Sequence, residues 1–226
     1  MDGERVTDVT NFLQILPAEQ SSYYIMAAKG KANNTFSGNS TLLVKEGVAL
    51  LRLGNYTGAI EYFDKALAIY PHNVKTLYNK GNALDDLGNY TGAVQYFDKA
   101  LAIDPHDFKA LNDKGVTLDH LGNYTGAIIY LDKALAIYPH NVKTLYNKGA
   151  ALDNLGNYTR ATVYYDDVLA IDPHHVKALN NKGNALDNLG NHTGAIIYFD
   201  KALAIDPHNV PALSNKVFNC MADKRC

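Results

Sequence analysis

Ionisable side chains recur along this chain at intervals of 34 residues, and their types limit the chemistry that it can do. One histidine follows the proline of each interval. If the intervals are stacked structural units, equivalent residues lie about 10 Å apart, whereas all ligands of one metal ion lie about 2 Å from it. We therefore expect no shared metal ion and no cofactor. The histidines are His72, His106, His140, His174 and His208.

Catalytic arrangements are missing from the sequence. It contains no Ser-His-Asp or Cys-His pattern with local motif support, no phosphate-binding loop and no paired carboxylates in a unique setting. The only two cysteines are Cys220 and Cys226, and their spacing is not typical of metal ligands. We expect two reduced thiols, with a disulfide as the alternative. The sequence thus predicts a protein that is not an enzyme.

Three rows of polar residues share the 34-residue spacing and could bind a peptide. An asparagine amide both donates and accepts hydrogen bonds, so a row of them could hold an extended backbone without reading its side chains. The alternative, that asparagine is only a soluble residue of a helix surface, stays open. The asparagine row consists of Asn79, Asp113, Asn147 and Asn181. A row of lysines lies four residues before it, and a row of aspartates follows it: Asp85, Asp119, Asp153 and Asp187. The predicted peptide-binding residues are Lys75, Asn79, Asn82, Lys109, Asp113, Lys143, Asn147, Lys177, Asn181 and Asn184.

A glycosylation sequon also recurs in every interval. It reads Asn-Tyr-Thr four times and Asn-His-Thr once, and two more sequons lie upstream. The residue after the threonine is usually glycine, which costs about 1 kcal/mol in a helix relative to alanine. The alternative is that each asparagine caps a helix. The predicted glycosylation sites are Asn33, Asn39, Asn55, Asn89, Asn123, Asn157 and Asn191.

The elements that position these residues follow from the interval 74–107. Leu77, Gly81, Leu84 and Leu87 form one helical stripe. Gly88-Asn89 interrupts it, a second apolar stripe follows, and Pro105 ends that. Each interval thus predicts two antiparallel helices of about 13 residues, each about 20 Å long. A fixed period of this size is typical of a solenoid in which each unit packs on its neighbours.

This spacing resembles the tetratricopeptide repeat family. The matching positions in this interval are Leu77, Gly81, Leu84, Ala93, Phe97, Ala100 and Pro105. The resemblance implies an all-α, right-handed superhelical solenoid whose first helices line a concave face. Within it, the asparagine row resembles the ladder of the O-linked N-acetylglucosamine transferase superhelix, broken at Asp113. The carboxylate clamp of chaperone-binding members is not matched.

One departure from the family pattern recurs. Lysine replaces the leucine before the glycine in four repeats, and glutamate replaces it in the first repeat. We expect the aliphatic stem of each lysine to pack while its ammonium group reaches solvent. These residues are Lys80, Lys114, Lys148, Lys182 and Glu46.

The match defines five repeats, with less regular segments at both ends. Residues 1–39 predict a degenerate helical cap, although Asn33 to Ser40 is typical of a loop. Residues 210–226 predict a lone terminal helix with apolar residues, such as Phe218, where a cap should be polar. The five repeats are residues 40–73, 74–107, 108–141, 142–175 and 176–209.

Composition narrows the function further. A net charge of −2 without a basic run argues against nucleic acid, and no apolar stretch approaches the roughly 20 residues that span a bilayer. The sequence favours a non-catalytic scaffold that binds a protein or peptide partner through its concave face. The alternative is a secreted or surface subunit that stacks head to tail into a filament. Without a signal peptide we expect a cytoplasmic protein, and an extracellular one if the sequons are used.

Overall fold

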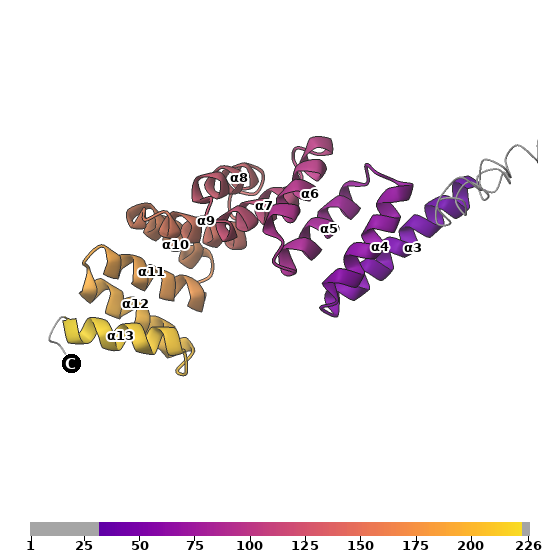
Figure 1. Cartoon of the computed structure of the whole chain (residues 1–226). Helices are drawn as coiled ribbons and strands as arrows, with labels where there is room; N and C mark the ends of the chain where they lie inside the picture. Colours follow the sequence, from indigo (N-terminus) through magenta and orange to yellow (C-terminus); the bar gives the residue numbers. More distant parts are fainter. Residues whose placement is uncertain (1–31, 223–226) are drawn as a thin grey trace, which may run out of the picture. The chain divides into compact units, whose positions relative to one another are not determined.

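A computed structural model describes the backbone of residues 32–222 and the side chains of residues 39–220. This part of the chain is helical without any strand, which confirms the predicted all-α class (Figure 1). Each repeat has a first and a second helix. The first helices are α3 (Ala32–Arg52), α5 (Val74–Asp86), α7 (Phe108–His120), α9 (Val142–Asn154) and α11 (Val176–Asn188). The second helices are α4 (Tyr56–Ile69), α6 (Tyr90–Ile103), α8 (Tyr124–Ile137), α10 (Tyr158–Ile171) and α12 (His192–Ile205); α13 (Val210–Ala222) follows.

The recurring turn residues determine where the helices begin and end. Gly122 has a φ of 74°, a conformation that glycine adopts without steric cost. The next residue, Asn123, caps α8, and its side-chain oxygen accepts a hydrogen bond from the Gly126 amide at 3.0 Å. The helix then ends at Ile137, two residues before Pro139. The helix boundaries therefore follow from the local sequence of each repeat.

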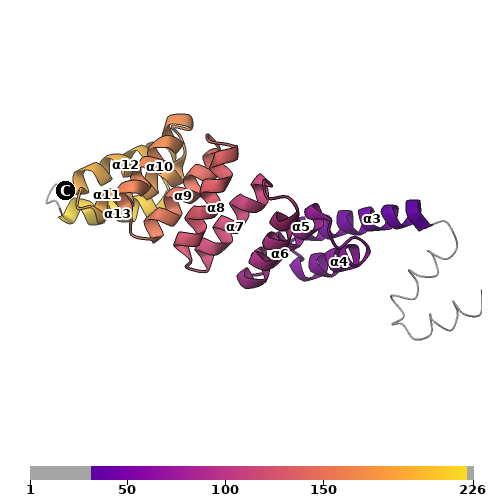
Figure 2. The ribbon, with the colours of Figure 1, turned by 90° about the horizontal axis from the view of Figure 1, so that it is seen from above.

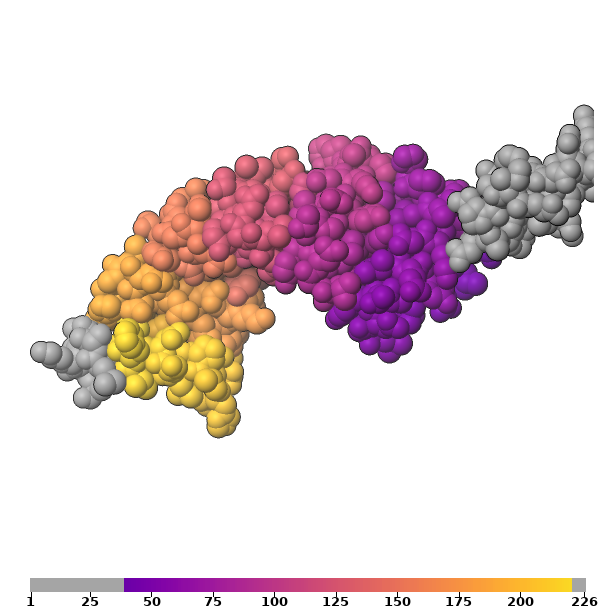
Figure 3. Space-filling view, viewed as in Figure 1, coloured from indigo at the N-terminus to yellow at the C-terminus, as the bar shows by residue number. Residues whose placement is uncertain are grey.

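The chain forms two compact units, one ending at Asn79 and the other beginning at Lys80. In the second unit each helix packs on the next one along the chain, from α6 to α13. The first helices α7, α9, α11 and α13 also contact one another in sequence order, whereas no second helix contacts another in this unit. Figures 2 and 3 show the same order of repeats from magenta to yellow. The first helices are thus the more closely packed side of the stack.

Close approach within a repeat depends on a glycine in the first helix. A Cβ atom added at Gly183 would lie 2.5 Å from Cε1 of Phe199, a ring that is fully buried. Gly81 faces Phe97 in the same way, with the added Cβ at 2.6 Å. The glycine therefore allows the two helices of a repeat to approach closely.

The recurring lysines differ from their prediction. The side chain of Lys114 is only 5% exposed, and its Nζ atom lies 3.8 Å from the centroid of the Tyr130 ring while pairing with Asp98 of the preceding repeat. Lys182 pairs likewise with Asp166, and it donates to the Tyr198 hydroxyl at 2.8 Å. The expectation that the ammonium group reaches solvent was wrong, because an aromatic ring and a carboxylate cover it.

Two expectations for the chain ends are corrected. Asn33 to Ser40 belongs to α3 and is not a loop. Cys220 is disulfide-bonded, so the expectation of two reduced thiols was wrong; the only other cysteine, Cys226, lies outside the described residues. The predicted cap over residues 1–39 lies mostly outside them too. None of the helices between Ala32 and Ala222 combines the length and the apolar character that crossing a membrane requires.

Candidate peptide-binding surface

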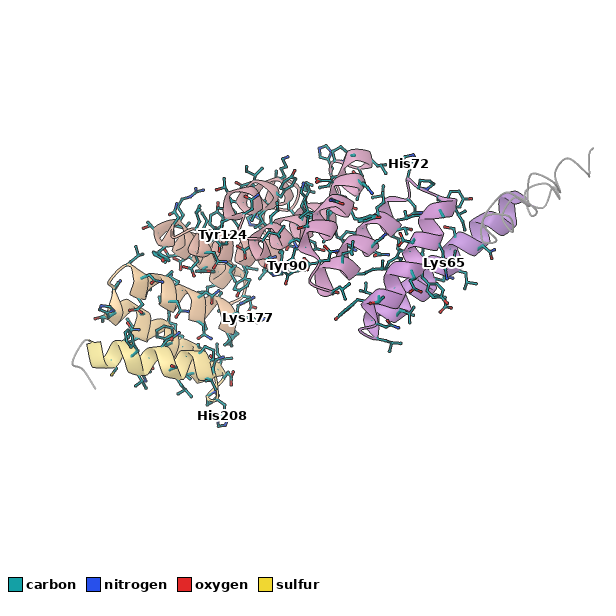
Figure 4. The ribbon with its side chains drawn as sticks, in the orientation of Figure 1. Lys65, His72, Tyr90, Tyr124, Lys177 and His208 are labelled. Atoms are coloured by element: carbon teal, nitrogen blue, oxygen red, sulfur yellow. The ribbon has the colours of Figure 1, made fainter. Side chains whose placement is uncertain are left out.

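The predicted peptide-binding residues of the second unit lie on its first helices. We refer to the surface that the lysine, asparagine and aspartate rows form on α7, α9 and α11 as the inner face. Lys109, Lys143 and Lys177 are exposed in the first turn of each helix, and Figure 4 shows Lys177 on α11. Asp113, Asn147 and Asn181 follow, half-buried, and the aspartate row lies near the other end of the helices.

The remaining predicted residues lie on α5 and α11. Lys75 and Asn79 lie on α5 in the first unit, where Lys75 is exposed and the Nδ2 atom of Asn79 is buried without a hydrogen-bond partner. Asn82 is half-buried on the part of α5 that belongs to the second unit. Asn184, on α11, accepts a hydrogen bond from the Asn215 side chain of α13 at 2.7 Å.

The asparagine row links consecutive first helices. Asn147 donates to the Asn112 side chain at 3.3 Å, and Asn181 donates to the Tyr146 hydroxyl at 3.1 Å. Each bond joins a repeat to the one before it. The amide donors are therefore partly used inside the protein, while the side-chain oxygens of Asn147 and Asn181 accept no hydrogen bond from the described residues. What the row offers to a ligand is mainly acceptors.

The lysine row is unevenly neutralised. Lys143 lies 3.5 Å from Asp113, the aspartate that interrupts the asparagine row one repeat earlier. For Lys177 the residue at the position equivalent to Asp113 is Asn147, which carries no charge. Among the described residues Lys177 forms no ion pair. Because aspartate replaces asparagine at Asp113, Lys143 has an ion-pair partner and Lys177 does not.

The aspartate row contains one member whose environment differs from the others. Asp85 accepts from Thr117 at 2.7 Å, Asp119 from Asn154 at 3.0 Å, and Asp187 lies 2.7 Å from Nδ1 of His192. Asp153 has no such donor among the described residues: Ala185 stands where Thr117 serves Asp85, and Asn188, which stands where Asn154 serves Asp119, forms no hydrogen bond with it. Its Oδ1 atom is buried and unpartnered.

The residue beside Asp153 also differs from its counterparts. It is Tyr165, which stands where the other repeats have phenylalanine or leucine. The Tyr165 hydroxyl lies 3.5 Å from Oδ2 of Asp153, the outer limit of a hydrogen bond. Burial raises the pKa of Asp153 to about 6, and the weak bond to Tyr165 only partly opposes this. Burial also raises the pKa of Tyr146, whose ring lies 5.2 Å from that of His175. Asp153 therefore carries a charge that the protein itself compensates poorly.

The sequons occupy helix N-termini. Asn55, Asn89, Asn123, Asn157 and Asn191 each cap a second helix by accepting a hydrogen bond from the backbone three residues on. A Cβ atom at Gly126 would lie 2.8 Å from Nδ2 of Asn123, but that side chain can move and Arg160 occupies the equivalent position, so nothing in the structure explains the recurring glycine. Asn39 is exposed on α3, and Asn33 lies on the same helix with its side chain outside the described part. Glycosylation stays a prediction.

The periodic histidines are exposed turn residues, as Figure 4 shows for His72 and His208. Between residues 39 and 220 the structure brings no three His, Cys, Asp or Glu side chains together in a metal-binding arrangement. The sequence reasoning missed Asp153 as a special case. Its signal was visible, however, since Tyr165 departs from Phe97, Leu131 and Phe199 at one repeat position.

Comparison with known families and structures identifies the architecture. Tetratricopeptide repeat profiles match residues 39–106, 78–142, 142–175 and 176–209. A MamA crystal structure is 26% identical, with a TM-score of 0.69 over 76% of this chain and 93% of that one. MamA 41-end from Desulfovibrio magneticus RS-1 is 25% identical, with a TM-score of 0.72 over 76% and 97%.

A third solved structure shares the fold. YrrB, described as a TPR protein with an unusual peptide-binding site, is 24% identical, with a TM-score of 0.70 over 83% of this chain and 96% of that one. No curated protein matches the sequence. These comparisons confirm the predicted solenoid type of fold, and they do not support a secreted filament subunit.

Proposed function

Because the chain belongs to the tetratricopeptide repeat family, we propose that it is a non-catalytic scaffold that binds an extended polypeptide on its inner face. One observation carries the proposal: polar side chains of one kind recur at one position of adjacent, contacting first helices. Asn147 and Asn181 leave their side-chain oxygens free to accept hydrogen bonds from the backbone amides of a peptide. A chain bound in this way is held mainly through its backbone.

The spacing of the row suits an extended chain. Packed helices lie about 8–10 Å apart, and an extended chain rises about 3.3 Å per residue. About three peptide residues therefore pass over each repeat. Each asparagine therefore lies within reach of a backbone amide of such a chain.

The test is selection of displayed random peptides on the immobilised full chain, followed by fluorescence anisotropy of the selected peptides. Asn147→Ala with Asn181→Ala should weaken binding by more than tenfold. Ile129→Ser with Ile197→Ser is the matched control, because both residues are half-exposed on the second helices, and it should leave binding unchanged. If no peptide is selected, or if both double variants bind equally, the proposal is wrong.

A second proposal is self-association through α13. This helix exposes Val210 at 71%, Val217 at 57% and Phe218 at 67%. In each repeat of the second unit a second helix covers the corresponding first-helix position, as Phe199 covers Gly183. Light scattering should detect oligomers that grow with concentration and that Phe218→Asp reduces. A monomer at every concentration would contradict this proposal and leave the scaffold role intact.

A further inference from the structure

Asp153 and Lys177, two opposite charges on the inner face of the second unit, form no ion pair among the described residues. Asp153 on α9 has a buried Oδ1 atom without any hydrogen bond, and its Oδ2 atom has only the 3.5 Å contact with Tyr165. Lys177 on α11 is exposed and unpaired among the described residues. By contrast, Asp119 accepts from Asn154 and Lys143 pairs with Asp113, whereas Lys109 on α7 also forms no ion pair among the described residues. The two unpaired charges occur in adjacent repeats.

These two residues lie on opposite borders of the asparagine row. Lys177 stands four residues before Asn181, whereas Asp153 stands six residues after Asn147. At 1.5 Å per helical residue, the lysine border lies about 6 Å from the row and the aspartate border about 9 Å from it. A peptide backbone lying along the row would therefore have a cationic border on one side and an anionic one on the other.

Resting on the peptide-binding role proposed above, we propose that the ligand is an extended peptide with a basic and an acidic residue three positions apart. The basic side chain pairs with Asp153 and the acidic one with Lys177. Side chains of an extended chain alternate in direction, so residues i and i+3 point to opposite sides. Three residues also correspond to about one repeat, which is the step from α9 to α11.

The lengths of the side chains favour this assignment. The aspartate border is the more distant one, and Asp153 is short, so a long lysine or arginine of the ligand is needed to reach it. The lysine border is nearer, and Lys177 is itself long and exposed, so a short carboxylate suffices there. Burial with no cation nearby also explains why the pKa of Asp153 is raised to about 6. A ligand cation would supply the missing partner.

The experiment repeats the peptide selection with Asp153→Asn and with Lys177→Gln. Peptides selected on the unsubstituted chain should be enriched in an acidic residue three positions from a basic one. Asp153→Asn should remove the preference for the basic residue, and Lys177→Gln that for the acidic one, each weakening a selected peptide by about tenfold. The matched controls Asp167→Asn and Lys133→Gln, which change exposed residues of the second helices α10 and α8, should alter affinity less than twofold.

A charge exchange gives the sharpest outcome. Asp153→Lys with Lys177→Asp should prefer the selected peptide in which the basic and acidic residues are interchanged. If peptides bind but show no such pair, or if Asp153→Asn acts no more strongly than Asp167→Asn, this inference is overturned while the scaffold role stands. If no peptide binds at all, the scaffold role fails and the inference fails with it.

Discussion

At the scale of single residues, Asp153 makes folding depend on pH in a direction opposite to that of a salt-bridged carboxylate. Burial raises its pKa from 3.8 to about 6, so the folded state takes up the proton first as pH falls. The groups that interact with it, Tyr165 and Tyr146, are uncharged in this range. Its charged form therefore destabilises the folded state above pH 6, and the penalty disappears as pH falls from about 6 to 3.8.

Asp153→Asn should accordingly stabilise the protein at pH 7. A shift of two pKa units corresponds to about 3 kcal/mol, and partial exposure reduces this to an expected gain on the order of 1 kcal/mol. Urea unfolding at a series of pH values should show the gain shrinking below pH 6 and vanishing near pH 4. Asp119→Asn should produce no gain, since Asp119 already has a donor in Asn154. A gain that does not vary with pH would contradict the assignment.

At the scale of secondary-structure elements, the buried lysines connect each repeat to the one before. Lys148 on α9 is 5% exposed and pairs with Asp132 on α8. Removing one partner of a buried pair leaves a charge uncompensated, whereas an apolar replacement removes the desolvation cost. Asp132→Asn should thus cost about 1–3 kcal/mol, and Lys148→Met should cost less than about 1 kcal/mol or stabilise. Equal losses in urea unfolding would contradict this account.

Replacing a glycine by alanine should change the stability in opposite directions in the first and second helices. At Gly183 the new Cβ would meet the buried Phe199 ring at 2.5 Å, so Gly183→Ala should cost about 1–3 kcal/mol. At Gly194 it would meet only the Asn191 side chain, and Arg160 occupies the equivalent place with its cap bond lengthened to 3.2 Å. Gly194→Ala should therefore be neutral or stabilise by up to about 1 kcal/mol. Thermal unfolding of the pair distinguishes the two sites.

The helices were predictable from the sequence because their signals are local and repeated: a cap such as Asn123, a turn glycine such as Gly122, and a proline after each second helix. The environment of Lys114 was not, because it depends on Asp98 of the preceding repeat and on Tyr130 of another helix. The special position of Asp153 likewise required knowing that Asn188 does not donate to it as Asn154 donates to Asp119. Contacts between repeats, rather than within them, were the part that the sequence reasoning missed.

At the scale of the whole molecule, the lysine pairs should make repeats interchangeable. Deleting residues 142–175 joins Asn141 to Val176 and brings Lys182 next to Asp132, which replaces its partner Asp166 with the same residue type. Because each repeat packs only on its neighbours, the shortened chain should fold, with fewer helical residues and a cooperative transition in circular dichroism. The same deletion combined with Asp132→Asn should unfold at lower urea, because Lys182 would then lack a carboxylate. A deletion variant without cooperative unfolding would show that stability depends on more than contacts between neighbouring repeats.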